Sequence, residues 1–284
     1  MNKKRIIKIT PSAGFCFGVK RAIQMAYDLL EEQRTEVYSI GEIIHNPQVV
    51  ERLSAKGLKV VKTPEEVPAG AFFLVRSHGM SPKVIEQLEE KGCKIIDATC
   101  PFVKGAQNAA KVFFEQGLTV VICGDPQHAE VVGIAGYAND EAVIVASAEE
   151  VDSLDVDKKR FGILSQTTQK IELLQSVVHR IIPKALYVAI RNTVCADSSK
   201  KQAEVRDLAV EVEVMVVIGG KNSSNTNKLV QISIAAGTPT YHIETEQELK
   251  QEWFKKVEKV GIAAGASTPQ ETIDKVVNEL RRMN

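Results

Sequence analysis

Two observations predict an α/β chain of three similar domains with mostly parallel sheets. Short β-rich runs alternate with helical patterns along the whole of the 284 residues, which is typical of chains that build parallel sheets. Three cysteines, Cys16, Cys100 and Cys195, each follow a strand-like run and precede a helical run. They lie 84 and 95 residues apart, with 89 residues after the last, so they divide the chain into near-equal thirds. We expect one domain in each third, at residues 1–98, 99–193 and 194–284.

The first third begins with a strand-like run at 5–10, and an amphipathic helical pattern with its apolar side chains on one stripe follows Cys16. Two later helices have marked starts. Asn46-Pro47 and Ser81-Pro82 each combine an N-cap residue with a proline at the first helical position. The other β-rich runs of this third lie at 37–40, 59–61, 72–75 and 94–97.

The other two thirds repeat this alternation. Helical runs follow Cys100 at 102–116 and Cys195 at 198–211. The β-rich runs lie at 120–123, 143–145, 161–164, 186–190, 214–218, 240–243 and 260–263. No low-complexity linker separates the thirds, so we expect them to pack together in a quasi-threefold arrangement.

Composition argues against several classes of partner. Because 36 basic residues balance 36 acidic residues, the overall charge calls for neither nucleic acid nor an anionic membrane. No apolar run reaches the ~18 residues of a membrane span, and no signal-peptide core follows the basic start. We therefore expect a cytoplasmic protein. In a reducing compartment, its five cysteines serve as ligands, nucleophiles or core residues rather than disulfides. The apolar neighbours of Cys93 and Cys123 predict small buried side chains.

The three evenly spaced cysteines predict an iron–sulfur centre. Each lies in a loop before a helix, where backbone N–H groups and the helix dipole favour a thiolate. They are far apart in sequence and form no CxxC pair, unlike the ligands of a structural zinc site. Three thiolates fit one [4Fe–4S] cluster per chain, with one iron that has no cysteine and is open to a substrate oxygen. One catalytic cysteine, or three unrelated cysteines, are the competing interpretations.

Polar loops after the strands repeat in the same threefold way. His45, His128 and Ser223 lie 29, 28 and 28 residues after the cysteine of their third. A second polar position follows later in each third: His78, Thr167 and Ser267. Because ligands of parallel sheets bind at the carboxyl ends of the strands, threefold symmetry would turn these positions and the cysteines toward one cavity.

The chemistry of these loops predicts a polyanion site. Helix N-termini with Ser, Asn and His donors bind anions, and residues 219–227 form a Gly/Ser/Asn loop before a helix. Residues 265–269 open the last helix in the same way. His45 and His78 also lie in loops that precede a helix start. A lone Ser or Asn at such a place is more often only a cap, but four such loops at matched positions favour a ligand.

Glu130 is the candidate proton donor. It lies two residues after His128, and in a closed, water-poor pocket a raised pKa would let it carry a proton. Thr167 is placed to relay or orient that proton. The competing interpretation of Glu130 is a first-turn carboxylate that satisfies the helix dipole, and the residues leave both open. His179 and His242 fall outside the threefold pattern, and we expect both to be structural.

Nine ordered motifs resemble those of the 4-hydroxy-3-methylbut-2-enyl diphosphate reductases, the last enzymes of the non-mevalonate isoprenoid pathway. The resemblance covers essentially the whole chain. The motifs are GFCFGV (14–19), EIIHN (42–46), SHG (77–79), DATCP (97–101), HAEV (128–131), QTT (166–168), NTVC (192–195), GGKNSSNTN (219–227) and AGAS (264–267). A single motif would be weak, but nine in the family's order are highly specific.

The resemblance implies three α/β domains around a central [4Fe–4S] cluster held by Cys16, Cys100 and Cys195. It implies that Glu130 delivers a proton, with Thr167 on the same network. The implied diphosphate ligands are His45, His78, His128, Ser223, Ser224, Asn225 and Ser267. The implied reaction uses two electrons and protons to remove the allylic hydroxyl of 4-hydroxy-3-methylbut-2-enyl diphosphate as water, forming isopentenyl and dimethylallyl diphosphate. A ferredoxin or flavodoxin-type protein would supply the electrons, and no bound flavin or nicotinamide is expected.

Two other functions compete with this one. A dehydratase of another phosphorylated alcohol would need no external electron donor. An iron–sulfur sensor would need a recognition element, and the chain has no evident DNA-reading element or basic tail. The chain also departs from common family residues after Cys100, at Ala129, and after Cys195, where Lys201-Gln202 stands in place of Arg-Gln. None of these departures removes a cysteine or the proposed acid.

Overall fold

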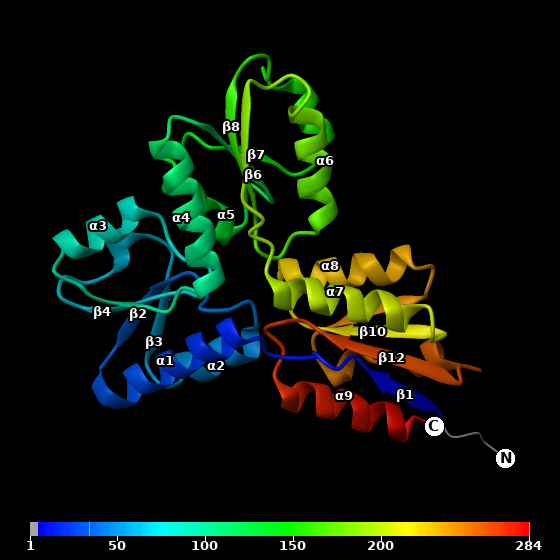
Figure 1. The fold of residues 1–284 in the computed structure, drawn as a ribbon. Helices are drawn as coiled ribbons and strands as arrows, with labels where there is room; N and C mark the ends of the chain where they lie inside the picture. The colour runs from blue at the N-terminus through cyan, green and yellow to red at the C-terminus, as the bar shows by residue number, and fades with distance from the viewer. Residues whose placement is uncertain (1–4, 34, 284) are drawn as a thin grey trace. The chain divides into compact units, whose positions relative to one another are not determined.

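The computed structural model describes residues 5–33 and 35–283, and within them it contains three parallel sheets of four strands each (Figure 1). Helices connect the strands and cover the sheets, as expected for parallel crossovers. The α/β class and the three similar parallel-sheet units predicted from the sequence are confirmed. Their arrangement around a common cluster stays a prediction.

The first sheet in chain order has the strand order β3-β2-β4-β5. Its strands are β2 (Val37–Ile40), β3 (Leu58–Val61), β4 (Phe72–Val75) and β5 (Lys94–Asp97). Its helices are α1 (Phe17–Gln33), α2 (Pro47–Ser54) and α3 (Pro82–Glu90), with a 3-10 turn η1 at Pro64–Glu66. The predicted starts of α2 and α3 are confirmed, since each begins on its proline.

The second sheet repeats this order as β7-β6-β8-β9. Its strands are β6 (Thr119–Cys123), β7 (Val143–Val145), β8 (Arg160–Ser165) and β9 (Tyr187–Ile190). The helices are α4 (Pro101–Glu115), α5 (Ala129–Gly136) and α6 (Ile171–Ile181), with a 3-10 turn η2 at Glu149–Ser153. Strands β6 and β8 are almost wholly buried, because helices cover both faces of a parallel sheet.

The third sheet has the order β11-β10-β12-β1 and draws its last strand from the other end of the chain. Its strands are β1 (Ile6–Ile9), β10 (Val214–Ile218), β11 (Thr240–Ile243) and β12 (Lys259–Ala264). The helices are α7 (Ala196–Ala209), α8 (Ser224–Ala235) and α9 (Gln270–Arg282), with the 3-10 turns η3 (Glu246–Glu248) and η4 (Gln251–Phe254). Alternate residues of β10 face opposite sides: Val216 packs with α9, whereas Met215 and Val217 pack with α7 and α8.

Strand β1 corrects one part of the predicted domain division. The sequence places it at the start of the first domain, but Ile6 pairs with Lys259 and Ile9 with Ile262 in the sheet of the last third. The buried strand β12 needs a partner on this side, and β1 supplies its ladder of hydrogen bonds. The last strand of every sheet therefore runs into a cysteine: β5 into Cys100, β9 into Cys195 and β1 into Cys16. The other boundaries of the three domains stay a prediction.

The chain divides into two compact units. One, here called the sheet-A unit, contains the sheet with β1 and β10–β12 and comprises the chain up to Phe17, His45–Pro47, and the chain from Ala196 onward. The other, here called the sheet-BC unit, contains the two remaining sheets and comprises Gly18–Ile44 and Gln48–Cys195.

Two expectations about individual side chains hold. Cys93 and Cys123 are buried free thiols, and burial raises the pKa of Cys123 to about 12.

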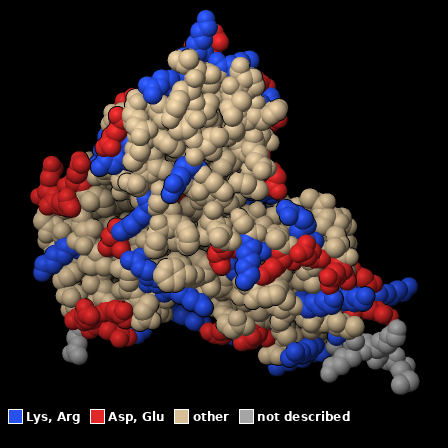
Figure 2. Space-filling model, viewed as in Figure 1, with Lys and Arg blue, Asp and Glu red and all other residues tan. Residues whose placement is uncertain are grey.

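No helix within residues 5–33 and 35–283 is long and apolar enough to cross a membrane. On the face drawn in Figure 2, acidic and basic side chains are interspersed, in keeping with the balanced composition.

Candidate active site

The three cysteines at the ends of β1, β5 and β9 occupy equivalent backbone positions. Each directly precedes the first residue of a helix, namely α1, α4 or α7. Each also donates its amide to the loop that follows the third strand of its own sheet. Cys16 N donates to Ala266 O at 3.1 Å, Cys100 N to Ser77 O at 3.0 Å, and Cys195 N to Thr167 O at 2.9 Å. The threefold repeat that the spacing of the cysteines indicates is therefore also present in the backbone hydrogen bonds of these cysteines.

The surroundings of these thiols suit metal ligation. All three thiols are half-buried and lie at helix N-termini, where the helix dipole stabilises negative charge. In the sheet-BC unit, a Cβ at Gly18 would lie 2.5 Å from Cys100 Sγ, so only glycine leaves room beside that sulfur. Within residues 5–33 and 35–283, no three His, Cys, Asp or Glu side chains form one group that could hold a metal ion. Cys100 and Cys195 belong to one unit and Cys16 to the other.

Glu130 and Thr167 form a buried pair in the sheet-BC unit. Glu130 lies in the first turn of α5 and is 2% exposed, and Thr167 follows β8. Thr167 N donates to Glu130 Oε1 at 2.6 Å, and Thr167 Oγ1 donates to Oε2 at 2.9 Å. Burial raises the pKa of Glu130 to about 7, although both hydrogen bonds from Thr167 lower it. The carboxyl can therefore hold and release a proton near neutral pH.

Two histidine rings lie close together in the same unit. His128 caps α5, and its Nδ1 accepts the amide hydrogen of Glu130 at 3.1 Å. An accepting Nδ1 leaves the proton of the neutral ring on Nε2, which can donate to a ligand. The ring centroids of His78 and His128 are 5.6 Å apart in an edge-to-face arrangement.

The sheet-A unit gathers hydroxyl and amide groups. Ser223 caps α8 and accepts the amide hydrogen of Thr226 at 3.3 Å. Asn225, in the first turn of α8, is 5% exposed, and its buried Nδ2 has no hydrogen-bond partner among residues 5–33 and 35–283. Ser267, after β12, donates its hydroxyl to His45 O at 2.9 Å. A buried donor without a partner is costly, so the Asn225 amide suits a ligand oxygen.

The predicted site residues therefore fall into two groups. The sheet-BC unit holds Cys100, Cys195, His78, His128, Glu130 and Thr167. The sheet-A unit holds Cys16, His45, Ser223, Ser224, Asn225 and Ser267. In the first group, hydrogen bonds and a ring contact join Cys195, Thr167, Glu130, His128 and His78 in a chain. In the second group, Ser267 donates to His45 O. The convergence of both groups on one cavity stays a prediction.

The structure adds residues that the sequence reasoning missed. Lys201 of α7 is 3% exposed and donates to the carbonyls of Ser12 and Gly14, which lie four and two residues before Cys16. Glu204, one turn further along α7, accepts from Ser12 N at 2.8 Å and from Ser12 Oγ at 2.5 Å. The only feature of the sequence that pointed to Lys201 was the Lys201-Gln202 pair, which stands where the family commonly has Arg-Gln.

Comparisons with known proteins agree with this geometry. The family model described as LytB protein matches residues 7–281. A 4-hydroxy-3-methylbut-2-enyl diphosphate reductase of Geobacter sulfurreducens is 43% identical over 278 residues, covering 98% of both chains. A solved Plasmodium falciparum structure, titled E-1-hydroxy-2-methyl-but-2-enyl-4-diphosphate reductase, matches 97% of this chain and 87% of its own, with a TM-score of 0.92 and 26% identity. A second solved structure, titled as the terminal enzyme of the non-mevalonate pathway, is 43% identical over 98% of this chain and 99% of its own, with a TM-score of 0.71.

Proposed function

This chain belongs to the LytB protein family and is a reductase of the non-mevalonate isoprenoid pathway, and we propose that it removes the hydroxyl group of 4-hydroxy-3-methylbut-2-enyl diphosphate. The proposed products are isopentenyl and dimethylallyl diphosphate, formed with two electrons and protons. The observation that carries the proposal is the buried carboxyl of Glu130. Thr167 holds that carboxyl through two hydrogen bonds and accepts the Cys195 amide through its own carbonyl, so one residue links the acid to a thiol ligand.

The proposed cofactor is a [4Fe–4S] cluster held by Cys16, Cys100 and Cys195. Three half-buried thiols at helix N-termini fit it chemically, and Gly18, which has no side chain, leaves room beside the Cys100 sulfur. When bound, the cluster would supply the electrons and an open Lewis-acidic iron for the hydroxyl group. A ferredoxin or flavodoxin-type protein is the proposed electron donor, and the cytoplasm is the proposed location.

The diphosphate of the substrate is proposed to bind side chains from both groups of site residues, those of the sheet-A unit and those of the sheet-BC unit. The sheet-A unit, which also contains His45, offers donors from Asn225 Nδ2, the helix N-terminus capped by Ser223 and the Ser224 hydroxyl. The Ser267 hydroxyl would turn from His45 O to the ligand. His78 and His128 offer ring donors from the sheet-BC unit. Helix N-termini and neutral donors suit a phosphate group, and binding at that end of the substrate positions the distant C–O bond.

Glu130 is proposed to deliver the proton that leaves with the hydroxyl group. Its pKa of about 7 keeps part of the carboxyl protonated at neutral pH, and Thr167 fixes both of its oxygens. A fixed and partly protonated carboxyl is the arrangement that general acid catalysis requires. The amide of Glu130 donates to His128, so the acid and a proposed diphosphate ligand share one helix turn.

The test is an anaerobic assay of reconstituted protein with 4-hydroxy-3-methylbut-2-enyl diphosphate and a chemical reductant. We expect about four irons per chain. Substrate should be consumed only when the reductant is present, and both isomeric products should form. Loss of substrate without reductant would instead support a dehydratase, and protein that takes up no iron would overturn the cluster.

Serine substitutions test the three ligands. We expect Cys16→Ser, Cys100→Ser and Cys195→Ser each to lose iron and nearly all turnover, because an alcohol is a poor ligand for iron–sulfur centres. Cys93→Ser is the matched control, since the Cys93 thiol is buried and donates to Pro68 O at 3.5 Å. Iron content and turnover should be unchanged in the control. Full turnover in any of the first three variants would contradict the proposal.

A further inference from the structure

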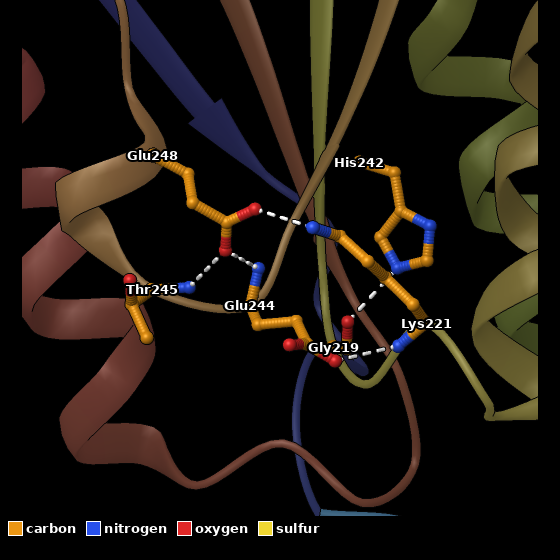
Figure 3. A network of polar contacts seen from close by, with 6 residues as sticks. All are labelled: Gly219, Lys221, His242, Glu244, Thr245 and Glu248. Carbon is orange, nitrogen blue, oxygen red and sulfur yellow. Dashed lines mark hydrogen bonds and ion pairs between the residues drawn. The ribbon is translucent and has the colours of Figure 1, made fainter.

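We propose that four residues to which no substrate contact is assigned hold the loop after β10 in the conformation that binds the diphosphate. Lys221 lies within this loop, whereas His242, Glu244 and Glu248 follow it in the chain, and the four are called the bracket below. The loop comprises residues 219–227 and includes Ser223 and Asn225. This inference rests on the proposed function, because it assigns the bracket a role in diphosphate affinity. All four residues belong to the sheet-A unit, and Figure 3 shows their contacts.

His242 fixes the first residue of the loop. Its Nε2 lies 2.8 Å from Gly219 O, and because a carbonyl can only accept, the ring donates. On its other side, Gly219 N donates to Ile243 O at 2.9 Å. Gly219 has a φ of +152°, and a Cβ there would lie 2.6 Å from Thr226 Oγ1. The strand β11 therefore holds both backbone polar groups of a residue that must remain glycine.

Lys221 is held at three points. Its amide donates to Glu244 Oε1 at 2.8 Å, and its Nζ lies 2.7 Å from Glu248 Oε2. Its carbonyl accepts from Asn227 Nδ2 at 2.9 Å, which closes the loop onto the start of α8. A lysine in a Gly/Ser/Asn loop suggests a direct phosphate ligand, but here the ammonium faces Glu248 (Figure 3). Lys221 is therefore a positioning residue.

Glu248 joins the loop to the 3-10 turn η3. Its Oε1 accepts from Glu244 N at 2.7 Å and from Thr245 N at 3.1 Å, while its Oε2 accepts from the Lys221 ammonium. Partial burial raises the pKa of Glu248, but the hydrogen bonds from Lys221 and the two amides lower it overall. The hydrogen bond to Glu248 raises the pKa of Lys221. Both groups thus stay charged at neutral pH, and the bracket persists there.

The sheet-BC unit contains a similar carboxylate cap on a 3-10 turn, but within the described part of the chain that carboxylate forms no ion pair with a loop. Glu66 Oε1 accepts from Lys62 N and Thr63 N, both at 3.0 Å, and caps η1 as Glu248 caps η3. Among the residues that the structure describes, no ion pair joins Glu66 to the loop after β2. Glu66→Gln is therefore a matched control, because it perturbs the cap alone.

The first experiment substitutes His242 in the reconstituted enzyme. His242→Leu removes the donor to Gly219 O, and His242→Gln keeps an amide N–H at a similar reach. We expect His242→Leu to raise KM for the substrate and Kd for inorganic diphosphate about 3- to 10-fold, the effect of one hydrogen bond. The value of kcat should stay within about twofold, and His242→Gln should restore affinity to within about twofold. Equal defects in both variants, or none in His242→Leu, would overturn the inference.

The second experiment is a double-mutant cycle on the ion pair. Because the pair is exposed, we expect Lys221→Met and Glu248→Gln each to raise Kd for inorganic diphosphate only about 2- to 5-fold. The double variant should be no worse than either single one, since both remove the same contact. Hydrogen exchange of residues 219–227 should be faster in all three, whereas Glu66→Gln should leave both readouts unchanged.

Two outcomes separate the inference from the proposed function. A large loss in Lys221→Met, with no effect in Glu248→Gln on affinity or on loop exchange, would make Lys221 a direct ligand and overturn the bracket alone. Wild-type enzyme that binds neither inorganic diphosphate nor substrate would overturn the proposed function, and the bracket's role in affinity with it.

Discussion

The first turns of α5 and α8 carry different chemistry on the same backbone. Glu130 lies two residues after the cap residue His128, and Asn225 lies two residues after the cap residue Ser223. The strands before these helices end alike, since Gly124 N donates to Val145 O and Gly219 N to Ile243 O, both at 2.9 Å. One position therefore holds a titrating carboxyl and its counterpart holds a neutral amide.

This difference assigns separate tasks to the two units. Thr167 satisfies both oxygens of Glu130, so that side chain is poised to exchange a proton. The Nδ2 of Asn225 has no hydrogen-bond partner in the part of the chain that the structure describes, so it is poised to donate to an anion. A carboxylate at the second place would repel a diphosphate, and an amide at the first could not titrate near neutral pH.

Glu130→Gln gives the largest expected effect. The variant keeps the shape of the side chain but removes the titrating proton, so we expect kcat to fall about 10²- to 10⁴-fold with KM changed little. Iron content should match that of the wild type. Steady-state kinetics of reconstituted protein provide the measurement, with the exposed Glu141→Gln as control. Wild-type turnover in Glu130→Gln would remove this residue from the proton path.

The same substitution should change how stability depends on pH. Because burial raises the pKa of Glu130 from 4.5 to about 7, the folded state binds this proton more tightly than the unfolded chain. The stabilisation is fully present below about pH 4.5 and is lost as the pH rises to about 7. Relative to Glu130→Gln, the free energy of unfolding should fall by on the order of 3 kcal/mol over that range. Parallel curves for the two proteins would show that Glu130 ionises normally.

Asn225→Asp reverses the comparison by placing a carboxylate in the sheet-A unit. We expect the KM for the diphosphate substrate to rise about 10- to 100-fold, because a donor is lost and a like charge faces the phosphates. The value of kcat should change less. Asn139→Asp, a substitution at an exposed amide, is the control. An unchanged KM would exclude Asn225 from the diphosphate site.

Thr167→Val tests the support of the carboxyl and has the smallest expected effect. The Thr167 amide still donates to Oε1, but the hydroxyl bond to Oε2 is lost. Because that bond lowers the pKa of Glu130, its loss should raise the pKa of this carboxyl further. A general acid acts while protonated, so the alkaline limb of the kcat–pH profile should move to higher pH. A limb that moves to lower pH, or does not move, would contradict this arrangement.

The residues themselves determined the repeat and the chemistry of the site. Cys16, Cys100 and Cys195 could be placed before helices because strand runs, apolar stripes and caps are signals between near neighbours in the chain. The same local signals placed Ser223 in a loop before a helix, and in the structure it is the cap residue of α8.

The tertiary structure decided which distant residues meet. The pairing of β1 with β12, the hold of Thr167 on Glu130, the link from His242 to Gly219, and the burial of Lys201 against Ser12 join segments between 23 and about 250 residues apart. Strand-edge pairing and side-chain hydrogen bonds of this kind depend on which backbone groups remain unsatisfied once the sheets have formed. That choice is made by packing across the whole unit, so no local pattern in the sequence records it.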